Sequence, residues 1–276
     1  MAVNLGRVGV WRRSDEWDPD VAVRLEELGY GTAWVGGSPE GSLQVADRLL
    51  AATERITVGT SIVNMWQDAA GVVAESFHRI EAAHPGRFVL GVGVGHPEAA
   101  QEYVRPYDKV VDYLDQLDGA GVPADRRVLA ALGPKVLRLA GERCAGAIPY
   151  LVTPEHTRWA REILGDGPVL APEQKVVLDT DAPRAREVGR EGVRNPYLSL
   201  VNYRRNLIRL GWPEQELDGG GTDRLIDALA VHGAAAAVVE GITAHLEAGA
   251  DHVAVQALGP SRGQAYEHIA GLLLGA

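Results

Sequence analysis

The sequence predicts an α/β fold, a (β/α)8 TIM barrel with an inserted helical segment between strands 7 and 8. Strand-like runs alternate with helix-like runs, which implies a parallel sheet. Eight such units fit into 276 residues, a common length for an α/β barrel of one domain. The strands turn polar at their last positions, as in barrels that build a site there. An open doubly wound sheet, with a crevice at its switch point, remains the alternative.

The first four units are bounded by residues that start and stop helices. Asp18-Pro19 starts a helix that Gly29 ends, and His84-Pro85-Gly86 ends another. The expected strands are 5–11, 30–35, 56–63 and 88–94, and the expected helices are 18–28, 43–52, 69–83 and 105–117.

The last four units follow the same order, and proline stands near the first turn of two helices, where its missing N–H costs nothing. The expected strands are 127–132, 147–152, 169–178 and 252–258, and the expected helices are 136–145, 154–164 and 263–274. The insertion comprises a helical region over 183–212 that is interrupted near Asn195-Pro196, a glycine-rich joint over 217–222 and a second helical region over 223–248. We expect residues 1–276 to form a single domain.

Composition restricts the class of partner. The formal net charge of −10 argues against binding of nucleic acid or of an anionic membrane, since both need a basic surface. The single cysteine, Cys144, excludes an intrachain disulfide and fits a reducing compartment. We see no signal peptide and no run of about 20 apolar residues. These features predict a cytoplasmic protein.

Two neighbouring strand ends, within residues 56–97, carry the central candidate site. The glycines of Gly91-x-Gly93-x-Gly95 keep the strand period and are not the dinucleotide fingerprint, which needs G-x-G-x-x-G at the start of a helix. They indicate either close packing in the barrel or a flat surface for a ring. His96 follows as a candidate for proton transfer or for a structural role. Asn64 is either a neutral donor and acceptor or a turn residue.

Two helix starts could bind an anion. Gly133-Pro134-Lys135 and Thr153-Pro154-Glu155 each follow a strand directly, and helix amino ends offer free N–H groups to phosphate or carboxylate. Simple capping is the alternative for both. The 183–212 segment is either a lid with basic groups facing an anionic ligand or a solvated helix. Three tryptophans stand near the ends of the first three strands: Trp11, Trp34 and Trp66. They either form the wall of a pocket or belong to the core.

Several catalytic signatures are absent from the sequence. It contains no HExxH, no CxxC pair, no G-x-S-x-G and no P-loop. Cys144 stands within an expected helix and is better explained as a core residue than as a nucleophile. Asp179 and Asp181 are better explained as helix caps than as metal ligands. We therefore predict no metal site.

The sequence resembles the luciferase-like monooxygenase superfamily, in particular its actinobacterial branch of coenzyme F420-dependent oxidoreductases. The matching pieces occur in the family's order: AATERITVGTSIVNMW, HPGRFVLGVGVGHPE, RVLAALGPKVLRLAGERCAGAIPYLVTPEHTRWAREILG and LEAGADHVAVQAL. The resemblance implies a (β/α)8 barrel, usually a homodimer, with a flavin or deazaflavin across the carboxyl ends of its strands.

The resemblance also implies positions for the site. A non-prolyl cis peptide behind the ring would be Ser61-Ile62, and Asn64, Gly95 and His96 would flank the ring. The phosphate-bearing tail would be held by Gly133, Pro134, Lys135, Leu151, Val152 and Thr153. Some members of the branch place Asp-His at the end of the second strand, where this chain has Gly36-Gly37-Ser38. Their substrate chemistry is therefore not transferred.

The resulting hypothesis is an F420-dependent oxidoreductase that moves a hydride between the deazaflavin and a small organic substrate. His96 would relay a proton, and Asn64 would orient the ring or the substrate. The alternatives are an FMN-dependent monooxygenase and a non-catalytic protein that binds F420. A phosphate-handling isomerase or aldolase is also open, although no lysine or paired-carboxylate site is evident at the strand ends.

Overall fold

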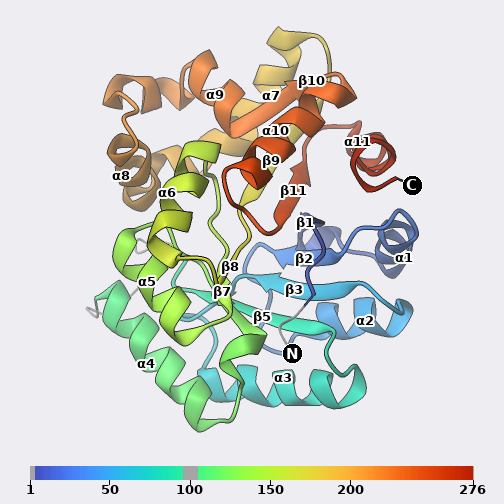
Figure 1. The fold of residues 1–276 in the computed structure, drawn as a ribbon, viewed down its shortest axis with the longest axis vertical. Helices are drawn as coiled ribbons and strands as arrows, with labels where there is room; N and C mark the ends of the chain where they lie inside the picture. The colour runs from blue at the N-terminus through green and yellow to red at the C-terminus, as the bar shows by residue number, and fades with distance from the viewer. Residues whose placement is uncertain (1–3, 96–104, 276) are drawn as a thin grey trace.

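The computed structural model describes residues 4–95 and 105–275, which form an α/β fold around one curled parallel sheet (Figure 1). The strands follow the order β10-β9-β11-β1-β2-β3-β5-β6-β7-β8, and β4 pairs with β5. Their bounds are β1 Val8–Arg13, β2 Thr32–Gly36, β3 Thr57–Ser61, β4 Val63–Asn64, β5 Phe88–Gly93, β6 Arg127–Leu129, β7 Gly146–Ala147, β8 Val169–Leu170, β9 Glu173–Leu178, β10 Ala230–Gly233 and β11 Val253–Ala257.

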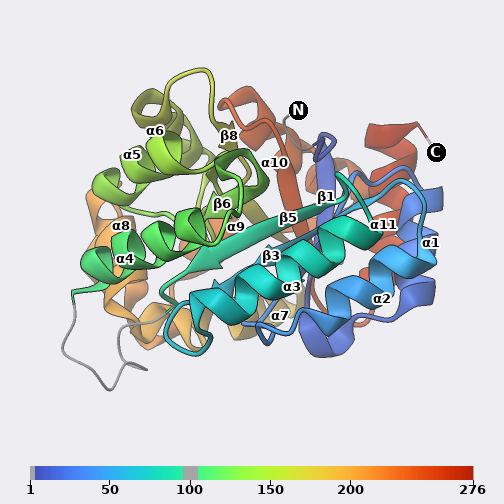
Figure 2. The ribbon, with the colours of Figure 1, turned by 90° about the horizontal axis from the view of Figure 1, so that it is seen from below.

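The helices lie around the outside of this sheet, and α3 runs along the β3–β5 side in both views (Figures 1 and 2). Their bounds are α1 Pro19–Glu27, α2 Gln44–Ala52, α3 Ala70–Ala83, α4 Pro106–Gly119, α5 Pro134–Arg143, α6 Pro154–Leu164, α7 Ala182–Arg194, α8 Val201–Arg209, α9 Asp223–Leu229, α10 Ala235–Glu247 and α11 Arg262–Ile269. Short 3-10 turns include η4 Tyr197–Ser199 and η5 Glu214–Gly220.

The sheet is curled, and its two end regions are joined by one short stretch of chain. Strand β8 pairs with β7, and β9 pairs with β11, yet only Ala171 and Pro172 separate β8 from β9. Backbone bonds continue on both sides of this gap, from Ala171 N to Ala147 O and from Ala254 N to Pro172 O, each 2.9 Å long. The order and the curl agree with the TIM-barrel-like fold that the sequence predicts.

Local sequence explains how the helices start. Proline occupies the first helical position of α1, α4, α5 and α6, where no N–H is needed. Asp18 caps α1 and Asp181 caps α7 through their side chains, so the capping interpretation of Asp181 is confirmed. The helix faces and the strands together bury one large apolar core and two smaller apolar clusters. Cys144 is buried in that core.

Several details of the predicted elements are wrong. The strand expected over 169–178 is two strands, β8 and β9, and the strand expected over 127–132 ends at Leu129. The helical region over 223–248 is broken by β10: α9 ends at Leu229, because the 230–233 backbone pairs with β9. Gly233 has a φ of +135° where β10 ends, before α10 begins. The sixth strand covers only 146–147, because Leu151 adopts a left-handed φ of 55° just beyond it. Cys144 follows the end of α5 instead of lying inside it. In 4–95 and 105–275, no helix has the length and apolarity needed to span a membrane.

Candidate functional site

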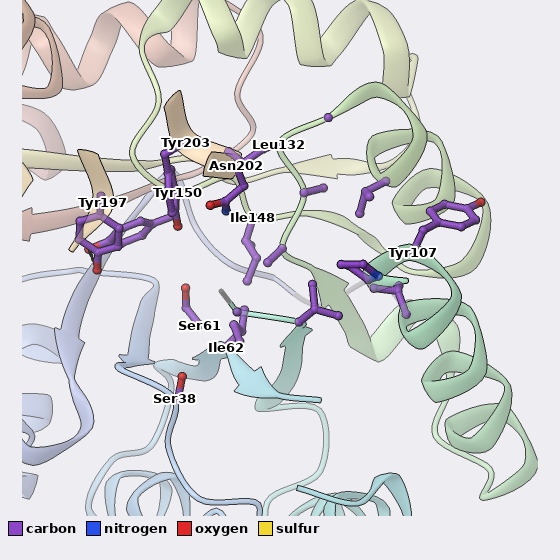
Figure 3. A pocket seen from close by; sticks show the side chains of 18 of the residues that line it. Ser38, Ser61, Ile62, Tyr107, Leu132, Ile148, Tyr150, Tyr197, Asn202 and Tyr203 are labelled. Carbon is purple, nitrogen blue, oxygen red and sulfur yellow. Dashed lines mark hydrogen bonds between the residues drawn. The ribbon is translucent and has the colours of Figure 1, made fainter. Parts of the chain in front are cut away.

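A cavity of about 290 Å³ lies at the carboxyl ends of the strands (Figure 3). Its wall combines the ends of β1, β2, β3, β5 and β6, the amino ends of α4 and α5, and residues of η4 and α8. Among the described residues none of the lining side chains carries a charge, and the polar ones are Trp11, Ser38, Ser61, Tyr107, Tyr150, Tyr197, Asn202 and Tyr203. Such a cavity suits a largely apolar, planar ligand held by a few hydrogen bonds.

Ser61 and Ile62 both line this cavity, and the peptide bond between them is cis, as the resemblance implied. Figure 3 shows both side chains facing the tyrosines across the cavity. Strand pairing places Ser61 beside Gly36, and β4 resumes at Val63 beside β5. The third and fourth strand ends therefore meet at one point of the wall, as expected from the sequence.

The glycines of β5 serve packing first and the cavity second. A methyl group on Gly91 would lie 1.8 Å from Thr60 O, so Gly91 is required for close contact between backbones. A methyl group on Gly93 would lie 2.8 Å from Ala130 Cβ. Gly95 lines the cavity and has a φ of +56°. The packing interpretation thus holds for Gly91 and Gly93, whereas Gly95 is part of the cavity wall.

Asn64 is buried beside this wall. Its Oδ1 accepts a hydrogen bond from Trp66 N at 3.0 Å, which is a turn role. Its Nδ2 points at Gly95, where an added methyl group would lie 2.8 Å away. Asn64 does not line the cavity itself. His96, the next residue after Gly95, lies outside the described residues.

The structure places only some of the predicted anion-binding residues at the cavity. Gly133 lines the cavity and Pro134 starts α5 behind it, while the Lys135 side chain is exposed. Leu151 and Val152 are buried, and Leu151 N donates to Glu173 Oε2 at 3.2 Å. Thr153 is buried at the start of α6, and its Oγ1 has no hydrogen-bond partner among the described residues.

Further unpaired polar groups surround these helix starts. His156 is buried on α6; its Nε2 bonds to Leu132 O at 3.1 Å, and its Nδ1 has no partner in the described structure. Burial lowers the pKa of His156 to about 4. On α8, Asn206 Nδ2 is likewise buried without a partner in 4–95 and 105–275. Buried polar atoms of this kind need a hydrogen-bond partner, which water or a ligand can supply.

Arg209 brings a positive charge to the same corner. Its Nη1 donates to Asn206 Oδ1 at 3.3 Å, and a methyl group on Gly133 would lie 4.0 Å from that nitrogen. Its guanidinium lies 5.6 Å from the centre of the Trp159 ring on α6. We call Thr153, His156, Asn206, Arg209 and the α5 start at Gly133 the anion corner.

One end of the cavity is aromatic. Figure 3 shows Tyr150, Tyr197 and Tyr203 gathered at one end, with Tyr107 at the other. The ring centres of Tyr150 and Tyr197 are 5.1 Å apart, and Trp11 lies 5.3 Å from Tyr150. Trp11 therefore walls the pocket. Trp34 instead belongs to the core, where its Nε1 donates to His252 Nε2 at 2.9 Å.

A buried ion pair supports the aromatic end. Lys175 and Glu173, both on β9, are almost fully buried, and their Nζ and Oε1 atoms are 3.1 Å apart. Lys175 Nζ also lies 3.9 Å from the centre of the Tyr150 ring. Burial raises the pKa of Glu173 and lowers that of Lys175, because both charges are desolvated. Both residues lie in the first half of β9, away from its carboxyl end, and neither lines the cavity.

The sequence contains a pattern that indicates this buried pair. Glu173-Gln174-Lys175 places three polar residues in succession within a strand whose neighbours are apolar. Charged residues are almost never fully buried unless they are paired. Three polar residues inside a buried strand therefore predict an internal polar cluster. Tyr150, Asn202 and Asn206 had no such signal, because only the tertiary fold brings them to the cavity.

Comparison with known proteins relates this chain to a protein family. Residues 18–121 match the sequence profile of a family described as luciferase-like monooxygenase. The resemblance to this family is confirmed. A curated relative of the luciferase-like segment is the F420-dependent glucose-6-phosphate dehydrogenase of Microbacterium testaceum (strain StLB037). It is 30% identical over 125 residues, which are 36% of this chain and 37% of that protein. The match thus spans little more than a third of the relative's length.

Two solved structures share the fold of this chain over almost its whole length. An F420-dependent secondary alcohol dehydrogenase in complex with an F420–acetone adduct is 15% identical, with a TM-score of 0.77 and 99% of each chain covered. The oxygenating constituent of 3,6-diketocamphane monooxygenase from Pseudomonas putida, in complex with FMN, is 15% identical, with a TM-score of 0.69. That match covers 96% of this chain and 97% of the other. At such identities the likeness concerns the fold.

Proposed function

We propose that this chain is a coenzyme F420-dependent oxidoreductase that moves a hydride between the deazaflavin and a small organic substrate. The observation that carries the proposal is the anion corner, where unpaired buried polar atoms and an arginine adjoin a cavity whose described lining side chains are uncharged. The F420-dependent dehydrogenases named above support the choice of cofactor. In this proposal the curled sheet is a closed eight-stranded barrel with its insertion between the seventh and eighth strands, and residues 1–276 are one domain of a cytoplasmic homodimer.

The residues present fit a cofactor with an anionic tail. Thr153 Oγ1, His156 Nδ1 and Asn206 Nδ2 are buried without partners in the described part of the chain. Thr153 and Asn206 can donate to a ligand oxygen, whereas neutral His156, whose Nε2–H donates to Leu132 O, offers Nδ1 only as an acceptor for a ligand hydroxyl. The amino ends of α5 and α6 add N–H groups and the positive end of the helix dipole. Arg209 adds a full charge beside Gly133. The phosphate of the coenzyme would bind in this corner, together with the exposed Lys135.

The ring of the coenzyme would lie in the cavity, beside Ser61, Ile62 and Gly95. When bound, the coenzyme supplies a two-electron hydride donor or acceptor. The apolar part of the cavity wall excludes water and strengthens the few hydrogen bonds made inside it. Asn64 would hold the Gly95 backbone in place through its Nδ2 group. His96 remains the proposed proton relay.

An FMN-dependent monooxygenase is the second candidate function. The likeness of fold to an FMN-bound oxygenating protein favours it. The anion corner serves either cofactor, because both carry a phosphate. The two candidates differ in the ring, so binding of each cofactor to the purified chain separates them.

The anion corner gives a direct test of the proposed cofactor site. Replacing Arg209 by alanine removes a charge-assisted hydrogen bond to the phosphate and is expected to weaken F420 binding by about 10- to 100-fold. Binding of the deazaflavin Fo, which lacks the phosphate tail, should be unchanged. Both affinities are measured by fluorescence titration.

Arg205 provides the matched control, since it is an exposed arginine on the same helix. Arg205→Ala should bind F420 as the wild type does. Equal loss of F420 and Fo binding in Arg209→Ala would place the arginine outside a phosphate site and contradict the proposal.

A further inference from the structure

The turn between β7 and α6 contributes to two parts of the candidate site. Strand β7 ends at Ala147, and α6 begins at Pro154. Within this turn, Tyr150 lines the cavity (Figure 3), and Thr153 belongs to the anion corner. The path of the backbone through these few residues therefore decides where both groups lie.

Leu151 gives the turn its shape. Its φ of 55° lies in the left-handed region, which is unfavourable for a residue with a Cβ atom and persists only where the surroundings hold it. In the described part of the chain, no backbone amide of residues 150–153 donates to a backbone carbonyl. The shape of the turn therefore depends on a contact from elsewhere in the fold.

Glu173, at the start of β9, supplies this contact. Its Oε2 accepts a hydrogen bond from Leu151 N at 3.2 Å, and its Oε1 accepts one from Lys175 Nζ at 3.1 Å. The backbone of the same residue bonds to the turn as well, from Glu173 N to Pro149 O at 2.9 Å. One buried residue thus contacts the turn on both sides of Tyr150.

Lys175 contacts the residue between these two points. Its Nζ lies 3.9 Å from the centre of the Tyr150 ring. Neither Glu173 nor Lys175 lines the cavity, so the pair acts on the site only through the turn. A well-packed apolar pair of similar size is often as stable as a buried ion pair, so stability alone does not require these charges.

We propose that Glu173 is a positioning residue that holds Leu151 in its left-handed conformation and so places Thr153 and the amino end of α6 for an anion. The inference rests on the proposed function, in which the anion corner binds the phosphate of the cofactor. It adds the residue that assembles one side of that corner. Glu173 itself touches neither the anion nor the ring.

Two double variants test this role as a matched pair. One combines Glu173→Gln with Lys175→Met, and the other combines Glu173→Met with Lys175→Met. Both remove the two charges with side chains of similar size, and they differ in one acceptor oxygen at Leu151 N. The methionine pair is expected to bind inorganic phosphate about tenfold less tightly than the glutamine variant, as measured on the full chain by ³¹P NMR titration.

Amide hydrogen exchange supplies a readout that a general loss of stability would not give. The Leu151 amide should exchange about tenfold faster in the methionine pair than in the glutamine variant, because its acceptor is lost. The Ile148 amide is the reference in the same segment, since it donates to Leu129 O at 3.0 Å and should exchange equally in both. Urea unfolding establishes that both variants are folded.

Equal phosphate affinities in the two folded variants would overturn the inference, and so would absence of phosphate binding by the wild type. Arg209→Ala should weaken phosphate binding by the wild type; an unchanged affinity would place the ion outside the anion corner and overturn the inference as well. Failure of the proposed function would look different: the wild type would not bind F420, although phosphate binding would still depend on the acceptor at position 173.

Discussion

Glu173→Gln is expected to lower the free energy of unfolding by about 3–5 kcal/mol, because it leaves the Lys175 ammonium buried without its counter-charge. Lys175 is 1% exposed, so water cannot replace the lost carboxylate. The loss should be seen in urea unfolding at pH 7, as a lower midpoint with an unchanged slope.

Two further variants show whether the lost charge causes this effect. Glu173→Gln combined with Lys175→Met removes both charges and should recover most of the lost stability. Asp15→Asn breaks the Arg13–Asp15 pair, whose side chains are 60% and 66% exposed, and should change stability by less than about 0.5 kcal/mol. If Glu173→Gln were as stable as the wild type, Lys175 would not carry a buried charge.

Acidification from pH 7 to pH 5 is expected to destabilise the fold through three buried histidines. Burial lowers the pKa of His156 and His252 to about 4 and that of His245 to about 3, from an ordinary 6.5. The unfolded chain binds protons below pH 6.5 while the folded chain does not, so stability falls from pH 6.5 down to about pH 4. At pH 5 each histidine contributes a loss on the order of 2 kcal/mol.

The hydrogen bonds of these histidines explain why they stay neutral. His245 bonds to Thr157 Oγ1 at 2.7 Å and to Gln174 Oε1 at 2.8 Å. His252 Nδ1 bonds to Gly6 O at 2.8 Å, and His252 Nε2 accepts a hydrogen bond from Trp34 Nε1 at 2.9 Å. A donor from Trp34 requires an unprotonated Nε2, so protonation would break that bond.

Urea unfolding at pH 7.0 and 5.0 measures the effect. Glu173 acts in the opposite sense, since its raised pKa favours the folded state at lower pH, and the Lys175→Met, Glu173→Gln chain removes that contribution. His245→Gln should reduce the pH dependence by about a third, and His84→Gln, at a partly exposed position, should leave it unchanged. A change below about 1 kcal/mol in the wild type would show that the histidines are protonated in the fold.

Much of the fold was predictable from the sequence because its elements are locally marked. Several helix starts are marked in the sequence by proline at the first helical position, and two of them by the capping residues Asp18 and Asp181. Strand β10 was not predictable, since Ala230-Val231 continues a helical pattern and only pairing with β9 makes it extended. Leu151 likewise takes its left-handed conformation from the tertiary fold.

The residues of the candidate site were predictable only where they stand at the ends of strands in the sequence. Ser61, Ile62, Gly95 and Gly133 follow strands directly, so the strand ends carry them to the cavity. Asn206 and Arg209 come from the insertion, and no local pattern tells which face of α8 turns toward the cavity. The Tyr150–Gln256 bond joins residues 106 positions apart and is likewise a product of the curled sheet.

Titration of the purified chain with coenzyme F420 and with FMN tests the central proposal most directly. Absorbance and fluorescence of each cofactor report its binding. The proposed function predicts saturable F420 binding at micromolar concentration, with weaker binding of FMN. Micromolar FMN binding together with no F420 binding would contradict it and favour the monooxygenase.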